Sequence, residues 1–519
     1  MPMPSRWCLA IALLLSAPVF AEQPCSGVTA CDQAQAPRMN DKQKGRFTQS
    51  AFERSVDEAD ARFDARDDAR AARLYDRIIG AREFATLRAD RQHDVLVRAL
   101  VLAWEQERPR RALALARRAF ALRPDAPDDL NRLAIALMET ERPADAAALV
   151  IALAKRDPAA LSHLDPILIP RLRLALGDDA PRRVAFLQAL LDAGWDDATE
   201  DSSALWYDLA LARVRRGETA LARQAMARIV EPESVIRLRA DKRFDALVDR
   251  DDPAFDVEAA AQRTIEALRA KTRQRPRSLE ARSSLLSALL VAGDLQAVLD
   301  LSDELERAVA AGGENPPYDD PDRLTWVLNT RAIALRRLGR LDEAVALMER
   351  IHRNPEQGRP NVSQAINLAT YECQAGHPER SLQRLDRIVD SDVSAYGRVQ
   401  VAAVRLCVAV AMQDRAAQAR AFRFIRKHRK ASQETHLDAL LLLGRIDEAA
   451  KRYIARLASE DERADALFEL QDTLRAEPLP GDRTIDASRR ALLARDDVRA
   501  AVERVGRIER HRIWVGYVF

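Results

Sequence analysis

Two helix-stopping prolines at equal places in consecutive segments constrain the fold of this chain more than any other sequence feature. Pro124 and Pro158 lie 34 residues apart, and each follows two runs of Ala and Leu residues spaced as on one face of a helix. Proline ends a helix because it lacks the backbone N–H and clashes with the preceding turn. Equal spacing of helix ends therefore predicts equal structural units, each built from two helices.

Residues 324–351 give the clearest example of such a unit. Leu328, Ala332 and Leu335 lie on one stripe of a first predicted helix, and a second apolar stripe follows Gly339. Glycine favours a helix end at this point because it adopts the left-handed conformation without strain. One helical hairpin cannot cover its own apolar face, so we expect these units to stack on one another.

The unit resembles the tetratricopeptide repeat, a helical hairpin of about 34 residues. Trp206-x2-Leu209-Ala210 is the best match to the start of the repeat pattern, although Arg213 stands where the family prefers an aromatic residue. Ala344-x3-Met348 matches the second half. The resemblance, to repeat proteins of the exported bacterial type, implies an all-α fold. This fold is a right-handed α-solenoid of helical hairpins whose first helices line a concave groove.

Composition agrees with a long helical chain. The chain has 519 residues, which is too long for one compact domain. It is 47% hydrophobic and 31% charged, and its abundant Ala, Leu and Arg residues favour helices. The net charge of +2 gives no general reason to expect nucleic-acid binding. We expect solenoid halves at 47–232 and 257–508, a charged connector at 233–256, and an apolar extended tail at 509–519.

The N-terminus has the pattern of a cleavable secretory signal at residues 1–21. Arg6 precedes the apolar run at 7–15, and cleavage is predicted after Ala21. Residues 22–46 are polar and lack periodicity, which predicts a disordered leader. We expect a periplasmic or secreted protein with no transmembrane segment in the mature chain, and association with the outer membrane stays an alternative.

Four cysteines remain after cleavage. Cys25 and Cys31 flank a short loop, and an oxidising compartment favours a disulfide there. Cys373 and Cys407 are one repeat apart. Equivalent positions on stacked helices are usually farther apart than the roughly 7 Å that a disulfide permits between Cα atoms, so we prefer two buried thiols to a bridge.

The chain ends in a different kind of pattern. Ile513, Val515, Tyr517 and Phe519 alternate with other residues as in a β-strand. A terminal Phe with this alternation resembles the last strand of outer-membrane barrels, but the chain lacks the many alternating strands that a barrel needs. We therefore expect a tail that docks on the final helices.

The sequence offers no catalytic motif. It contains no H-E-x-x-H, no G-x-x-x-x-G-K and no G-x-S-x-G, and its seven histidines lack the spacing of metal ligands on one helix. We expect a protein without enzymatic activity, cofactor or metal site.

Polar residues on the first helices of the repeats are candidates for binding a partner. By analogy with the repeat family, the groove candidates are Tyr207, Arg215, Asn329, Arg336, Arg337, Thr370 and Gln374. Arg405 interrupts an apolar helix, where a charge needs a partner. A structural ion pair is the preferred interpretation for Arg405, and a place in the groove is the alternative.

The densest basic run lies at residues 420–430. Its candidate contact residues are Arg420, Arg423, Arg426, Lys427, Arg429 and Lys430. Cations at a helix C-terminus interact favourably with the helix dipole, which is a structural explanation. The functional explanation is a patch for an anionic partner.

These patterns predict an exported helical-repeat scaffold that binds a protein or peptide partner of the cell envelope in its concave groove. The alternative is an accessory protein of envelope polysaccharide or outer-membrane export that binds an anionic polymer. A hydrolase of unfamiliar type is a third hypothesis, without a nucleophile–base pair to support it.

Overall fold

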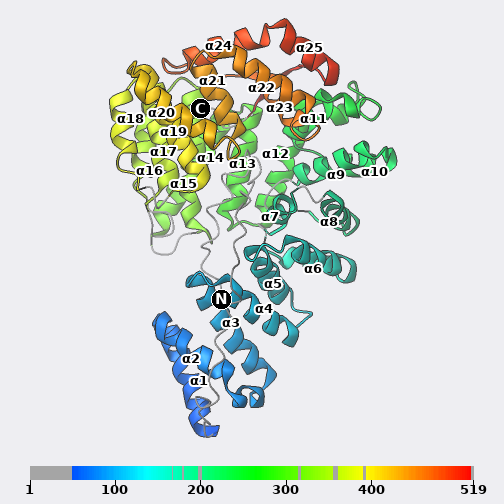
Figure 1. Ribbon diagram of the computed structural model, residues 1–519, viewed down its shortest axis with the longest axis vertical. Helices are drawn as coiled ribbons and strands as arrows, with labels where there is room; N and C mark the ends of the chain where they lie inside the picture. Colours follow the sequence, from blue (N-terminus) through cyan, green and yellow to red (C-terminus); the bar gives the residue numbers. More distant parts are fainter. Residues whose placement is uncertain are drawn as a thin grey trace, which may run out of the picture. The chain divides into compact units, whose positions relative to one another are not determined.

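The computed structural model describes residues 49–165, 168–177, 180–196, 202–313, 317–354, 360–389 and 393–515. These residues form an all-α fold of successive helical hairpins, as the sequence predicts, with one short two-stranded sheet (Figure 1). The expected signal peptide, the leader, Cys25 and Cys31 lie outside the described residues. Contacts divide the chain between Asp196 and Asp197 into two compact units.

In the N-terminal unit each of the helices from α1 to α6 packs on the next α-helix along the chain, and α8 packs on α6. Helix α4 ends two residues before Pro124 and α6 ends two residues before Pro158, which confirms the predicted helix stops. The helices are α1 (Gln49–Asp64), α2 (Asp68–Gly80), η3 (Arg82–Thr86), α3 (Ala89–Glu105), α4 (Pro109–Leu122), α5 (Pro127–Glu139), α6 (Pro143–Arg156), η4 (Pro158–His163), α7 (Leu168–Ala175) and α8 (Ala180–Asp192).

The C-terminal unit continues the same arrangement over more hairpins. Its helices up to the middle are α9 (Ser203–Arg215), α10 (Thr219–Met226), α11 (Pro232–Ala240), η5 (Lys242–Phe244), η6 (Pro253–Phe255), α12 (Val257–Gln274), α13 (Leu279–Ala292), α14 (Leu295–Gly312), η7 (Pro321–Arg323), α15 (Leu324–Arg337) and α16 (Leu341–Ile351). The remaining elements are α17 (Val362–Gln374), α18 (Pro378–Leu385), α19 (Ala395–Ala411), α20 (Arg415–Lys427), α21 (Gln433–Leu442), α22 (Ile446–Ala458), α23 (Arg463–Glu469), β1 (Asp472–Leu474), α24 (Arg483–Leu493), α25 (Asp496–Val505) and β2 (Arg510–Trp514). None of the described helices is long and apolar enough to cross a membrane.

The turns within hairpins depend on left-handed backbone conformations. Gly339 after α15 has φ 76° and Gly376 after α17 has φ 88°, as predicted for helix-ending glycines. The next hairpin has no glycine at this point, and Gln413 takes φ 57° instead. Asp414 then starts α20 by accepting hydrogen bonds from the backbone of Ala416 and Ala417.

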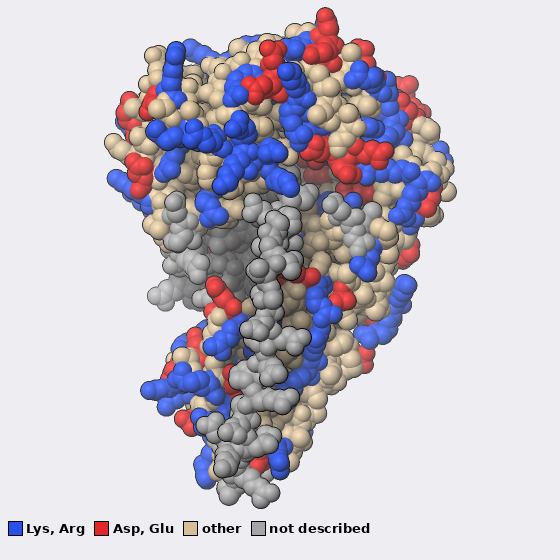
Figure 2. Space-filling view, viewed as in Figure 1, with Lys and Arg blue, Asp and Glu red and all other residues tan. Residues whose placement is uncertain are grey.

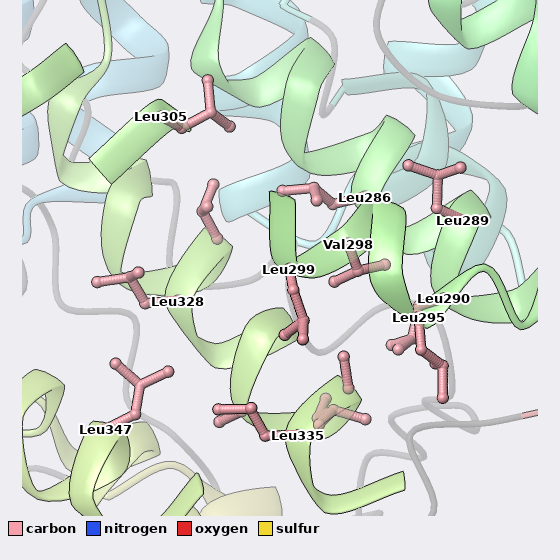
Figure 3. Close-up of a cluster of buried hydrophobic side chains, with 14 of the residues drawn as sticks. Leu286, Leu289, Leu290, Leu295, Val298, Leu299, Leu305, Leu328, Leu335 and Leu347 are labelled. Atoms are coloured by element: carbon pink, nitrogen blue, oxygen red, sulfur yellow. The ribbon is translucent and has the colours of Figure 1, made fainter. Parts of the chain in front are cut away.

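The core of the C-terminal unit lies between consecutive helices. A leucine-rich cluster joins α13, α14, α15 and α16 (Figure 3). Leu328, Ala332 and Leu335, the predicted stripe of α15, are all buried. Because each hairpin covers the apolar face of its neighbour, this cluster extends over several successive helices.

The expected connector at 233–256 is largely structured. Helix α11 occupies its first part and packs on α12 and on α23, and short turns η5 and η6 follow. Asp241, inside this segment, is fully buried and bonded by the Arg243 guanidinium. The division into units falls earlier in the chain, between Asp196 and Asp197.

The end of the described chain is extended, as predicted, but its docking site differs from the expectation. Strand β2 pairs in parallel with β1, and its principal helix neighbours are α12 and α13, not the final helices. Ile513 is buried, and Trp514 lies against Gly293 at the end of α13. The C-terminal segment therefore returns to α12 and α13, in the first half of its own unit.

The expectation of free thiols at Cys373 and Cys407 is wrong, because the two residues form a disulfide. Helices α17 and α19 are first helices of successive hairpins and pack directly on each other. This packing brings the two Cα atoms to 6.4 Å, which is within the range of disulfides. The one-repeat spacing thus places the cysteines side by side.

Candidate binding surfaces

The predicted groove residues on α9 contact the chain itself. Tyr207 is buried with its ring against Phe244, and burial raises the pKa of its hydroxyl. Arg215 forms an ion pair of 3.0 Å with Asp461, in the segment that precedes α23. Tyr207 is therefore closed to a partner, whereas Arg215 is exposed and already has an acidic partner in the chain.

The predicted residues on α15 are held in the same way. Arg336 forms a 2.8 Å ion pair with Asp482, and the two side chains are 7% and 14% exposed. Arg337 donates to the backbone oxygen of Leu290 and lies over the Trp514 ring, 4.5 Å from its centroid. Both arginines therefore bind segments that follow α23 in the chain.

The remaining predicted residues, on α15 and on α17, also make internal bonds. Asn329 accepts a hydrogen bond from Asn367, and Thr370 donates to the backbone oxygen of Ile366. The backbone oxygen of Gln374 accepts from the amide of Gly481 at 2.9 Å. These candidates stabilise the stack and the contact between the stack and its C-terminal segment.

The preferred ion pair of Arg405 is not found among the described residues. Its neighbours Val404 and Leu406 are buried, whereas Arg405 is exposed. The apolar stripe of α19 is narrow enough to leave this position outside. A single charge in an apolar helix therefore did not require a buried partner here.

A segment that the sequence pattern does not reveal covers α15 and α17. Residues 475–480 have no regular secondary structure, and Gly481 and Asp482 follow in a turn. A Cβ atom on Gly481 would lie 2.9 Å from the Cys373 backbone oxygen, so only glycine fits. The one available signal, the Pro-Leu-Pro-Gly run, predicts a turn but gives no docking site.

The basic run is arranged differently from the groove candidates. Phe422 and Ile425 face the core of the unit, whereas the cations of α20 and the following turn are exposed. We define the basic surface by these side chains, which form no ion pair within the described part of the chain: Arg415, Arg420, Arg423, Arg426, Lys427, Arg429 and Lys430. In Figure 2 a broad cluster of Lys and Arg side chains lies where Figure 1 labels α19 and α20.

The absence of acidic residues makes this surface electrostatically distinct. The chain carries no Asp or Glu between Asp414 and Glu434, and Asp414 is used to cap α20. Elsewhere exposed arginines pair locally, as Arg340 does with Glu343. Like charges three or four residues apart repel on a helix, and no ion pair within the described residues offsets this repulsion on the basic surface.

The positive charges of the basic surface affect the pKa of a buried histidine. His436 on α21 stacks on Phe422, and its pKa falls to about 4. Burial is the largest cause, and positive charges that include Arg429 and Arg426 add to it. The imidazole is therefore neutral at pH 7.

No protein-family model matches the chain, and no curated protein matches it. Three solved structures illustrate the similarities that were found. Yeast Tom70 is 11% identical with a TM-score of 0.27, covering 86% of this chain and 97% of that chain. A structure of Naa15/Naa10 bound to HypK-THB is 14% identical with a TM-score of 0.23, covering 87% and 73%. A circular tandem repeat protein is 13% identical with a TM-score of 0.14, covering 88% and 97%.

Proposed function

We propose that this protein is a non-catalytic helical-repeat scaffold that binds an acidic segment of a partner protein through the basic surface. The observation that carries the proposal is the set of exposed cations on α20 and its following turn, which form no ion pair within the described residues. Groove candidates such as Arg215 and Arg336 already bind the chain itself. The proposed docking site is therefore outside the predicted groove.

The spacing of the cations fits an extended acidic segment. Arg420, Arg423 and Lys427 lie on one side of a helix that rises about 1.5 Å per residue, so they span roughly 10 Å. In an extended chain, which rises about 3.3 Å per residue, acidic side chains a few residues apart are separated by similar distances. Arginine is suited to this contact because its guanidinium binds a carboxylate through two parallel hydrogen bonds.

We further propose that the scaffold works outside the cytoplasm, in a periplasm or a secreted state. The pattern at residues 1–21 and the disulfide between Cys373 and Cys407 support this location, because disulfides persist in oxidising compartments. In the cell envelope the second candidate partner is an anionic polysaccharide. The same basic surface favours it, as part of an export system.

Binding of synthetic polyanions tests the proposal and separates the two partners. We expect poly-glutamate to bind the full chain, and the variant R423E/R426E to weaken that binding by roughly tenfold or more. The matched control is R269E/R273E, because Arg269 and Arg273 are exposed cations of α12. Binding should also weaken as salt increases.

Three outcomes count against parts of the proposal. Equal loss in R423E/R426E and in R269E/R273E would mean that net charge, not this surface, governs binding. Preference for polygalacturonate over poly-glutamate would favour the polysaccharide. Absence of binding to both polymers at low salt would reject the basic surface as a docking site.

A further inference from the structure

Helices α15 and α17 carry a second candidate site, and the chain fills it with its own residues. Arg336 and Gln374 form its wall. Gly481 donates its amide to the Gln374 backbone oxygen, and the Asp482 carboxylate accepts from Arg336 at 2.8 Å. The occupant is thus a glycine followed by a side-chain carboxylate.

The occupant leaves part of the wall unused. Nε of Arg336 and Oε1 of Gln374 are buried, and neither has a hydrogen-bond partner among the described residues. Both residues are at least nine-tenths buried. Buried polar atoms are usually paired, because an unpaired one costs about 1–3 kcal/mol. The wall therefore has one hydrogen-bond donor, Nε of Arg336, and one acceptor, Oε1 of Gln374, that the residues now bound to it do not use.

The segment that leads to Gly481 is not packed into a core. Residues 475–480 are irregular and mostly exposed, with no fully buried side chain. Burial raises the pKa of Asp482 in spite of its ion pair with Arg336. The attraction to Arg336 therefore does not fully offset the free energy of desolvating the carboxylate. Segments of this kind open locally at a low free energy.

We propose that the wall formed by Arg336 and Gln374 is a receptor site for a partner peptide that carries glycine followed by aspartate, and that residues 479–482 occupy this site in cis until such a peptide displaces them. The glycine is required because a Cβ atom would lie 2.9 Å from the Cys373 oxygen and 2.9 Å from Gln374 Cα. The aspartate is required to reach Arg336. This site is separate from the basic surface and does not depend on it.

The test uses a labelled peptide with the sequence of residues 476–485 and the full-length protein. Gly481→Ala in the protein expels the cis segment by steric clash and leaves the wall intact. We expect this variant to bind the peptide roughly tenfold or more tightly than the wild type, because competition lowers apparent affinity by the fraction of open sites. Peptides carrying Gly481→Ala or Asp482→Asn are the matched controls, and both should lose binding.

The double variant G481A/R336Q should also lose binding. The proposal is overturned if the folded G481A variant does not bind the peptide, or if it binds the control peptides equally well. Should G481A not fold, hydrogen exchange on the wild type decides. Saturating peptide should speed exchange of the Gly481 amide, which now donates to Gln374, and unchanged exchange would overturn the proposal.

Discussion

Arg336 and Asp482 are 146 residues apart in sequence and form an ion pair of 2.8 Å that is almost completely removed from solvent. The contact joins α15 to the turn before α24. Together with the contact between Arg337 and Trp514, it holds the C-terminal segment on the hairpins of the same unit. These contacts explain why Arg336 and Arg337, two of the predicted groove residues, are held inside the chain.

Removal of Arg336 should destabilise the C-terminal unit. In R336M, Asp482 loses its partner while it stays largely buried, and breaking such a pair costs roughly 3 kcal/mol. Urea denaturation of R336M, D482N and the double variant measures the coupling. We expect the double variant to be less destabilised than the sum of the single variants, whereas simple additivity would argue against a direct pair.

Reduction of the disulfide should lower stability. The bond between Cys373 and Cys407 closes a segment of 34 residues, and such a link stabilises by about 3–4 kcal/mol through the unfolded chain. The urea midpoint of the wild type should fall in reductant. The variant C373S/C407S should show a low midpoint that does not respond to reductant, and equal midpoints for all samples would contradict the account.

Gln413→Gly should stabilise the protein. Gln413 takes φ 57°, and this left-handed conformation costs a residue with a Cβ atom about 1–2 kcal/mol. Glycine avoids that cost, but its more flexible unfolded chain cancels part of the gain. We expect a gain of roughly 0.5–1 kcal/mol in thermal or urea unfolding. Gly339→Ala is the matched reverse change at φ 76° and should destabilise the protein.

Stability should depend on pH through His436. Its pKa is about 4 in the folded chain and 6.5 in the unfolded chain, so the unfolded chain binds the extra proton between these values. Neutral His436 therefore contributes to the free energy of unfolding, and this contribution is fully present above pH 6.5. It is lost as the pH falls toward 4, by up to about 3 kcal/mol. The variant H436Q should show a smaller loss between pH 7 and pH 5, and an identical loss would contradict this assignment.

The local features of this fold follow from sequence spacing. The helix stops before Pro124 and Pro158 and the buried stripe of Leu328, Ala332 and Leu335 need only neighbouring residues for their prediction. Spacing also identified the basic run, because its charges are contiguous in the chain. Arg415, one turn earlier, was missed because it stands apart from that run.

Contacts between distant segments could not be predicted in this way. The one-repeat spacing of Cys373 and Cys407 placed them at equivalent sites, but only the close packing of α17 on α19 shows that their Cα atoms meet. Gly481 and Asp482 belong to an irregular turn, which has no period to reveal what it covers. The groove candidates were chosen by helix face, and the face alone does not show that the chain occupies it.

The pKa of His436 in the presence of an acidic ligand tests most directly whether partners dock on the basic surface. NMR titration of histidine-labelled protein measures this pKa without and with saturating poly-glutamate. Ligand carboxylates that neutralise Arg426 and Arg429 should raise the pKa above about 4, since these charges help to lower it. An unchanged pKa with poly-glutamate bound would contradict the account and place the partner elsewhere.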